Sequence, residues 1–491
     1  MRKTKIVCTL GPASADEKVM EAMLRAGMNV ARFNFSHGTH ESHREMMQRF
    51  RAVRDRLGVA AAVMLDTKGP EIRLKDMAGG EAMLADGAEF TLTARDVQGD
   101  AAQVSITYAE LPREVKAGDR ILIDDGRVSL RVQETTDTDI RCLVEHGGRI
   151  ATHKGVNVPG VHLNMPYLSE ADKSDLIFGI ENDVDYVAAS FARSAQDMIE
   201  MRRFLNYHGG HRVRVIAKIE NGEGVDNFDE ILSHCDGIMV ARGDMGVEIA
   251  YERLPGLQKR FIRRCYQAGK VAITATQMLE SMIASPSPTR AEITDVANAV
   301  FDGTSAVMLS GESASGRYPV EAVAAMARIA AQAECDAFDM GVYKGFDHDM
   351  DTSDATNAIC DAACTTARDV GARAILTVTM TGRSARGISK FRPEEPIVGA
   401  TPDEKTFQQL SLSWGVYPVR SLRQNSTEEL CRHVVDCARN ADVIDEGDLV
   451  VITAGEPQDV SKGTTLLRVL NAKKRLREDG FPLCRPGGGI F

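Results

Sequence analysis

The sequence predicts an α/β protein: a (β/α)8 barrel with an inserted β-rich lid domain and a C-terminal doubly wound α/β domain. Two observations predict this class. Over about the first 340 residues, eight short β-rich runs alternate with amphipathic helical stretches. Polar side chains follow six of these runs. Because barrels collect their functional groups past the C-terminal strand ends, this second pattern also indicates a functional site.

The eight runs predict the parallel strands of the barrel, with helical patterns after most of them. Ser14 and Glu17 form a capping-box pattern that predicts the start of the first helix, and Thr39–Leu57 predicts a long second helix. The predicted strands are Lys5–Thr9, Asn29–Phe33, Ala61–Leu65, Asp185–Ala189, Val213–Lys218, Gly237–Ala241, Lys270–Thr274 and Ser305–Leu309.

One long interruption separates the third and fourth strands. Residues 70–166 contain short alternating runs, such as Arg120–Asp124 and Ile140–Glu145, among many Gly and Asp turn residues. We expect a β-rich lid domain there, which stands over the barrel mouth and excludes water on closure. The remaining boundaries are predicted as 1–69 and 167–345 for the barrel, 352–472 for the C-terminal α/β domain and 473–491 for a tail of unknown role.

Composition and charge exclude several classes of protein. The net charge of -11 argues against a dedicated nucleic-acid binder, which carries a basic excess. No apolar run approaches the ~18 residues of a membrane span. The charged strand directly after Met1 predicts no signal peptide. Ten cysteines are too few for a disulfide scaffold, so reduced thiols in a cytoplasmic protein are expected.

The strongest local signal is Lys218-Ile219-Glu220 at the end of the fifth strand. Side chains alternate along a strand, so the ammonium and the carboxylate point to the same face. Taken alone, this pair is better explained as a structural ion pair. Polar groups at five other strand ends favour a functional site, where a metal ligand beside a cation suits chemistry that moves negative charge between oxygens. These strand ends are Arg32–His37, Asp66–Lys68, Arg242–Asp244, Ala275–Gln277 and Ser310–Glu312.

Long, ordered motifs over about residues 1–470 resemble the pyruvate kinase family. They are Lys5–Pro12, Arg32–Gly38, Leu65–Arg73, Lys154–Asn157, Ile216–Asn221, Arg242–Asp244, Ala275–Glu292 and Asp302–Glu312. The resemblance implies phosphoryl transfer from phosphoenolpyruvate to ADP, giving pyruvate and ATP in the last step of glycolysis. It also implies a homotetramer.

The resemblance implies roles for residues at the strand ends. Lys218 lies against the transferring phosphoryl group, and Arg32 binds phosphate. Glu220 and Asp244 hold Mg²⁺ or Mn²⁺. The backbone N–H groups of Gly243 and Asp244 receive the substrate carboxylate, together with Thr276. A proton relay to the enolate carbon is expected through Thr276, Ser310 and Glu312.

A monovalent-cation site and a nucleotide site are also implied. Asn34, Ser36, Asp66 and Thr67 resemble a potassium site, and Glu71 stands where the family's potassium-dependent members carry a glutamate. The chain contains neither GxxxxGK[ST] nor GxGxxG, so ADP is expected between barrel and lid. The residues expected at the nucleotide are Arg73, Lys154 and His37, although Lys154 taken alone is better explained as a solvated surface lysine.

In the C-terminal domain, Thr379-Met380-Thr381-Gly382-Arg383-Ser384 lies between a strand and a helix. The stretch is either an ordinary capped turn or, as the resemblance implies, a cradle for the phosphate of an allosteric sugar-phosphate activator. The predicted effector residues are Thr379, Thr381, Arg383 and Ser384. Two alternatives stay open: a non-catalytic paralogue that only senses a sugar phosphate, and an aldolase-like carboligase barrel.

Overall fold

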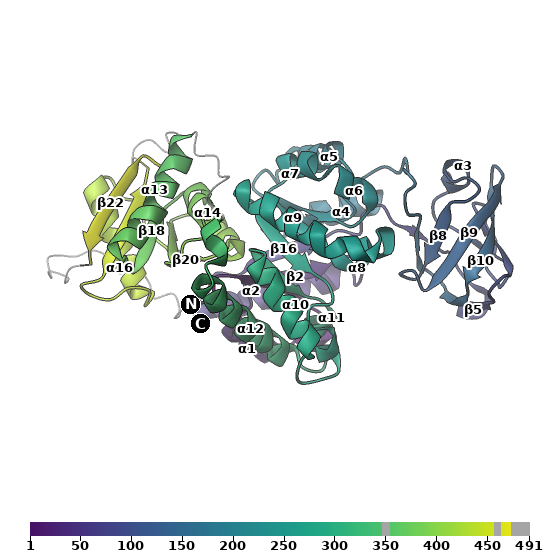
Figure 1. Cartoon of the computed structure of the whole chain (residues 1–491), viewed down its shortest axis with the longest axis horizontal. Helices are drawn as coiled ribbons and strands as arrows, with labels where there is room; N and C mark the ends of the chain where they lie inside the picture. Colours follow the sequence, from purple (N-terminus) through teal and green to yellow (C-terminus); the bar gives the residue numbers. More distant parts are fainter. Residues whose placement is uncertain (346–353, 456–462, 473–491) are drawn as a thin grey trace.

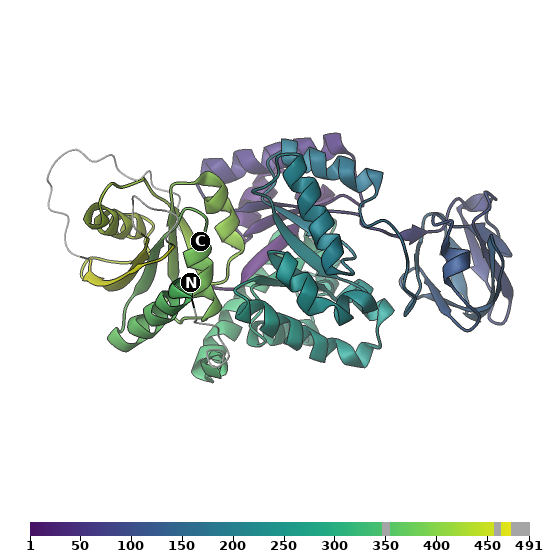
Figure 2. The same cartoon turned by 90° about the horizontal axis from the view of Figure 1, so that it is seen from above.

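The computed structural model describes residues 1–345, 354–455 and 463–472, and it has three parts in a row (Figure 1). A barrel occupies the centre, a β-rich insertion projects from one end, and a C-terminal α/β part covers the other (Figures 1 and 2). The predicted tail 473–491 lies outside the described residues. Within the described residues, no helix is both long enough and apolar enough to cross a membrane.

The central part is a closed barrel of eight parallel strands, as predicted. It closes where β1 pairs with β17, with Lys5 opposite Ala306. Each strand lies within one residue of its predicted bounds, because each is an apolar run buried on both faces. The strands are β1 Lys5–Thr9, β2 Val30–Asn34, β3 Ala62–Asp66, β13 Tyr186–Ala189, β14 Arg214–Ile219, β15 Gly237–Ala241, β16 Val271–Ala275 and β17 Ala306–Leu309.

Helices surround the barrel (Figure 1). The predicted cap of the first helix is wrong: Asp16 accepts a hydrogen bond from Lys18 N at 2.8 Å, whereas Ser14 ends a 3-10 turn, Pro12–Ser14. The predicted second helix is confirmed, with Thr39 as its N-cap. The helices are α1 Glu17–Ala26, α2 His40–Leu57, α4 Glu170–Glu181, α5 Ala195–Tyr207, α6 Gly222–Asp226, α7 Phe228–His234, α8 Arg242–Glu248, α9 Leu254–Gln267, α10 Arg290–Phe301, α11 Gly311–Ala314 and α12 Pro319–Asp339.

The β-rich insertion follows β3, so it projects from the C-terminal ends of the barrel strands. It has its own apolar core around a seven-stranded sheet in the order β4-β12-β8-β9-β10-β6-β7, with β11 and β5 paired separately. It reaches the barrel where Asn157 Nδ2 donates to Glu248 Oε1 at 3.0 Å. Its elements are β4 Ile72–Arg73, β5 Glu81–Leu84, β6 Glu89–Thr93, β7 Gln103–Ser105, α3 Leu111–Glu114, β8 Arg120–Ile123, β9 Val128–Thr135, β10 Asp139–His146, β11 Gly148–Ala151 and β12 Gly155–Asn157.

The C-terminal part is a five-stranded sheet in the order β20-β19-β18-β21-β22. Its strands are parallel except β22, which pairs antiparallel with β21. Separate apolar clusters cover the two faces, as expected for a doubly wound domain. The elements are α13 Ala355–Val370, β18 Ala374–Val378, α14 Arg383–Lys390, β19 Ile397–Thr401, α15 Glu404–Gln409, β20 Val416–Arg420, α16 Thr427–Asn440, β21 Leu449–Ala454 and β22 Leu466–Asn471.

This C-terminal part closes the N-terminal end of the barrel. Leu412, in a 3-10 turn after α15, is fully buried in one apolar cluster with barrel residues Val30, Tyr186 and Ile216. The Tyr186 hydroxyl donates to Gln409 O at 2.6 Å. The barrel is therefore filled at this end, and its open mouth is at the C-terminal ends of the strands.

Candidate active site

A buried network of charges joins the ends of β2, β3 and β14 at the barrel mouth. Asp66 Oδ2 accepts from Arg32 Nε at 2.5 Å, and Asp66 Oδ1 accepts from Lys218 Nζ at 3.1 Å. Lys218 Nζ lies 3.0 Å from Glu220 Oε1. Burial favours the neutral amine form of Lys218, but the negative charges of Asp66 and Glu220 have the larger combined effect and raise the pKa of Lys218. Lys218 is therefore a charged lysine held in place between two carboxylates.

The end of β13 adds Ser190, a residue that the sequence analysis missed. Its Oγ accepts from Lys218 Nζ at 2.8 Å and donates to the Thr67 carbonyl at 2.7 Å. The next residue, Phe191, has φ +53° and donates its backbone N–H to Glu220 Oε2 at 2.6 Å. One strand end thus positions both members of the Lys218–Glu220 pair. Ser190 directly follows the predicted strand, so the strand-end rule used elsewhere would have found it.

Glu220 and Asp244 form a pair of neighbouring carboxylates. Burial raises the pKa of Glu220 to about 7, with Asp244 adding to the shift, and burial also raises the pKa of Asp244. A buried carboxylate beside a half-buried one suits a hard divalent cation, because Mg²⁺ is commonly bound through one or two carboxylates. Among the described residues, no group of three or more His, Cys, Asp or Glu side chains is arranged as a metal site.

Thr276 and Gly243 meet where β16 and β15 end. Gly243 N donates to Thr276 Oγ1 at 2.8 Å, and the hydroxyl donates to Ala275 O at 2.6 Å. Glu312, also predicted for this region, is buried and accepts from Ser310 N at 2.7 Å and Leu279 N at 3.1 Å. Its carboxylate ties the end of β17 to the loop after β16, and burial raises its pKa.

The four predicted potassium residues lie on adjoining strand ends. Asn34 faces Asp66 across the β2–β3 pair, and its Oδ1 accepts from Ser36 N at 3.1 Å. The Thr67 hydroxyl accepts from Ser190 N at 3.1 Å. The four residues thus lie at the adjoining ends of β2 and β3, where Arg32 and Lys218 share the Asp66 carboxylate.

Two of the predicted nucleotide residues lie together on the β-rich insertion. Arg73 on β4 donates to Glu71 Oε2 at 2.7 Å and to His153 O at 2.8 Å. Lys154 precedes the paired strand β12, and its Nζ lies 2.8 Å from Asp124 Oδ1. The third residue, His37, is on the barrel, exposed in the loop after β2.

The predicted effector residues lie in the turn before α14 and in the first two positions of that helix. Thr379 Oγ1 accepts from Gly382 N at 3.0 Å, and the buried Ser384 hydroxyl lies 2.5 Å from Thr464 Oγ1. Arg383 is exposed, 4.0 Å from Asp354 Oδ2, and Thr381 is exposed as well. Thr464 is the contact that local sequence reasoning did not assign, because it is 80 residues further along the chain.

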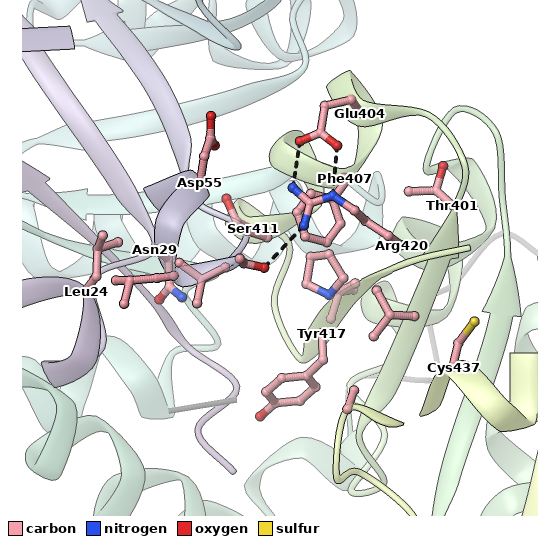
Figure 3. Close-up of a pocket in the computed structure, with 18 of the residues that line it drawn as sticks. Leu24, Asn29, Asp55, Thr401, Glu404, Phe407, Ser411, Tyr417, Arg420 and Cys437 are labelled. Atoms are coloured by element: carbon pink, nitrogen blue, oxygen red, sulfur yellow. Dashed lines mark hydrogen bonds and ion pairs between the residues drawn. The ribbon is translucent and has the colours of Figure 1, made fainter. Parts of the chain in front are cut away.

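A large cavity of about 1090 Å³ lies elsewhere, between the barrel and the C-terminal part (Figure 3). Asn29 lines it from the barrel side, and Tyr417 and Arg420 line it from the C-terminal side. Arg420 pairs with Glu404 at 3.0 Å across one wall. The cavity is at the N-terminal ends of the barrel strands, opposite the charged mouth, and its lining includes none of the four predicted effector residues.

A barrel with paired cations and carboxylates at its C-terminal strand ends is an enzyme of the class that works on anionic oxygen groups. A "Pyruvate kinase, barrel domain" family model matches residues 1–323, and a "Pyruvate kinase, alpha/beta domain" model matches residues 357–470. The chain belongs to the pyruvate kinase family and is a phosphotransferase.

Individual relatives agree with the family models over nearly the whole chain. A pyruvate kinase of Clostridium acetobutylicum is 48% identical over 474 residues, which cover 96% of this chain and 99% of that protein. One of Clostridium perfringens is 46% identical, with 96% and 99% covered. One of Geobacillus stearothermophilus is 45% identical, with 95% of this chain and 80% of that protein covered.

Proposed function

We propose that this enzyme transfers the phosphoryl group of phosphoenolpyruvate to ADP, giving pyruvate and ATP. The observation that carries the proposal is the buried Arg32–Asp66–Lys218–Glu220 network at the barrel mouth. Phosphoryl transfer needs little covalent chemistry from the protein. It needs positioning and fixed positive charge where the equatorial oxygens carry negative charge. Two buried cations held by Asp66 supply that charge without reorganising during the reaction.

We assign the following roles to residues in and around this network. Lys218 and Arg32 bind the phosphoryl oxygens. Thr276 and the backbone of Gly243 and Asp244 orient the substrate carboxylate. The proposed proton-relay residues are Thr276, Ser310 and Glu312, and burial raises the pKa of the Glu312 carboxyl above its ordinary value.

Glu220 and Asp244 are the residues that would hold Mg²⁺ or Mn²⁺. The ion, when bound, supplies charge neutralisation for the transferring group. Asn34, Ser36, Asp66 and Thr67 would hold K⁺, a large ion suited to weakly charged oxygen ligands. Glu71 supports this, since it stands where the family's potassium-dependent members carry a glutamate. Full turnover in buffer free of potassium would refute the requirement.

ADP is proposed to bind between barrel and insertion, at Arg73, Lys154 and His37. The Asn157–Glu248 contact supports an insertion that closes on the barrel. A sugar phosphate is proposed as an activator, held by Thr379, Thr381, Arg383 and Ser384 at the start of α14. We further propose a cytoplasmic homotetramer, which light scattering on the purified protein would test.

The first test is pyruvate release from phosphoenolpyruvate and ADP, with Mg²⁺ and K⁺ present. Lys218→Met is expected to lower kcat by about 10²-fold or more, because a preorganised donor to the transition state is lost. Lys405→Met is the matched control. Lys405 is also buried and ion-paired, 3.4 Å from Asp185 Oδ1, but it lies at the closed end of the barrel. Its variant is expected to keep the parental kcat.

Other outcomes favour the alternatives. A parent that binds a sugar phosphate but forms no pyruvate would support the non-catalytic sensor. Carbon–carbon bond formation from phosphoenolpyruvate and an aldehyde would support a carboligase, although the α/β-domain match at residues 357–470 favours the kinase. Phosphoenolpyruvate saturation curves that are unchanged by any sugar phosphate would refute the effector site.

A further inference from the structure

The loop after β16 holds two neighbouring residues in the left-handed backbone conformation. Thr276 has φ +69° and Gln277 has φ +54°. Neither is glycine, and for β-branched Thr276 this conformation is a real outlier. Such strain persists only where surrounding groups over-determine the conformation, and it gathers at functional sites. The contacts that keep Thr276 in this conformation are therefore relevant to the reaction.

The side chain of Arg242 contacts both peptide groups of this turn. Its Nε donates to Ala275 O at 3.2 Å, and its Nη2 donates to Thr276 O at 2.7 Å. The carbonyl carbons of Ala275 and Thr276 are the two outer atoms of the φ torsion of Thr276. One planar guanidinium thus restrains both ends of the strained torsion, which a single-point cation does not do.

Arg242 is itself oriented from another element. Its Nη1 lies 2.7 Å from Asp295 Oδ1 on α10, and the Arg242 side chain is only 17% exposed. All three guanidinium nitrogens are therefore engaged. The residue after Arg242 is Gly243, whose N–H donates to Thr276 Oγ1. The side chain at position 242 and the backbone at position 243 hold the carbonyl and the hydroxyl of the same threonine.

We propose that Arg242, oriented by Asp295, is a positioning residue for the reaction. It holds Thr276 in the left-handed conformation and thereby sets the hydroxyl against the Gly243 N–H at the substrate carboxylate position. Arg242 acts through Thr276 and binds no substrate atom itself. This inference rests on the proposed function, since it deepens the part that Thr276 has in it.

Steady-state kinetics of Arg242→Met test the inference. We expect kcat/KM for phosphoenolpyruvate to fall by about 10-fold to 10²-fold, because a misplaced substrate contact lowers the rate on this scale. KM for ADP is expected to stay within about twofold. Arg242→Lys should behave like Arg242→Met, because lysine keeps the positive charge but lacks the planar guanidinium that donates to two carbonyls at once. A kcat/KM within about twofold of the parent would overturn the proposal.

Arg202→Met is the matched control. Arg202 also pairs with an aspartate, Asp236, at 2.8 Å and donates to a carbonyl, Val213 O, at 2.7 Å, but it lies away from the mouth on α5. Its variant should keep the parental kinetics. If Arg202→Met and Arg242→Met lose activity and thermal stability to the same extent, Arg242 has only a structural role and the proposal is overturned.

A second variant separates positioning from general damage. Glycine adopts φ +54° without strain, so adding Gln277→Gly to Arg242→Met should recover part of the lost kcat/KM. A crystal structure of Arg242→Met should show Thr276 with negative φ, and a Thr276 that stays left-handed would overturn the proposal. This structural readout needs no turnover. A parent that makes no pyruvate would therefore refute the proposed function and leave the Arg242 inference to be decided by the structure.

Discussion

Leu412→Ala is expected to weaken the attachment of the C-terminal part to the barrel. Leu412 is fully buried in the apolar cluster at the closed end of the barrel, among hydrogen-bonded strands that cannot collapse around a void. Truncating a buried leucine costs about 2–5 kcal/mol, rising with the residual cavity. Because rigid strands line this site, we expect the upper part of that range, about 3–5 kcal/mol.

The chain carries its own probe for this experiment. Trp414 is its single tryptophan, only 1% exposed, and it lies two residues beyond Leu412. The Arg392 guanidinium carbon is 4.5 Å from the centre of its ring. Urea unfolding followed by Trp414 fluorescence therefore reports on the junction itself. With a urea m-value of about 2–3 kcal/mol per molar, the midpoint should fall by about 1–2.5 M.

Leu422→Ala is the matched control, because this leucine of the same part is 49% exposed. Its free energy of unfolding should change by less than about 0.5 kcal/mol. A Leu412→Ala midpoint within about 0.3 M of the parent would refute the reasoning. The C-terminal part would then be held by its polar contacts, such as Tyr186 with Gln409, and not by Leu412.

Two further variants test strain and buried charge. Gly69 has φ +74°, and a Cβ there would lie 2.9 Å from Ser190 Cβ, so Gly69→Ala should cost about 1–3 kcal/mol and lower turnover by displacing Ser190 from Lys218. Gly87→Ala, at the same φ of +74° with no atom within 4 Å, is the control and should leave turnover unchanged. Burial lowers the pKa of Lys5 to about 7, from 10.5, so the unfolded chain binds more protons between those pH values and the stability of the parent rises across them. Lys5→Met should therefore be more stable than the parent at pH 6, by a margin that shrinks toward pH 10; urea midpoints that differ by a constant amount would contradict this.

The barrel strands were predictable because a strand buried on both faces is a continuous apolar run, a signal contained in the strand itself. The pairing of Lys218 with Glu220 was predictable for the same reason, since alternation along one strand places both on one face. The first helix cap was mispredicted because Ser14 and Asp16 compete locally. Asp16 accepts the hydrogen bond from Lys18 N in the first turn of the helix. The spacing of Ser14 and Glu17 alone does not show which of the two residues is the N-cap.

Contacts between distant segments were harder to predict. Ser190 could have been found as one more polar residue at a strand end, but its contacts with Lys218 and Thr67 depend on the folded barrel. The Ser384–Thr464 and Arg242–Asp295 contacts join segments 80 and 53 residues apart. Leu412 looks like any apolar residue in a short turn. Its burial inside the barrel depends on how the C-terminal part docks, which no local pattern encodes.

The closure of the barrel between β1 and β17 affects how the chain folds during synthesis. Lys5 on β1 cannot pair with Ala306 on β17 until Ala306 has been synthesised. At a synthesis rate of about 5–20 residues per second, that takes roughly 15–60 seconds. Throughout this time, the nascent β1 is an apolar strand with one edge unpaired, the kind of edge that recruits other chains. The β-rich insertion, whose strands all lie between residues 72 and 157, can fold long before then. A growing chain therefore carries a finished insertion beside an open barrel, and this is the stage at which a chaperone would be needed most.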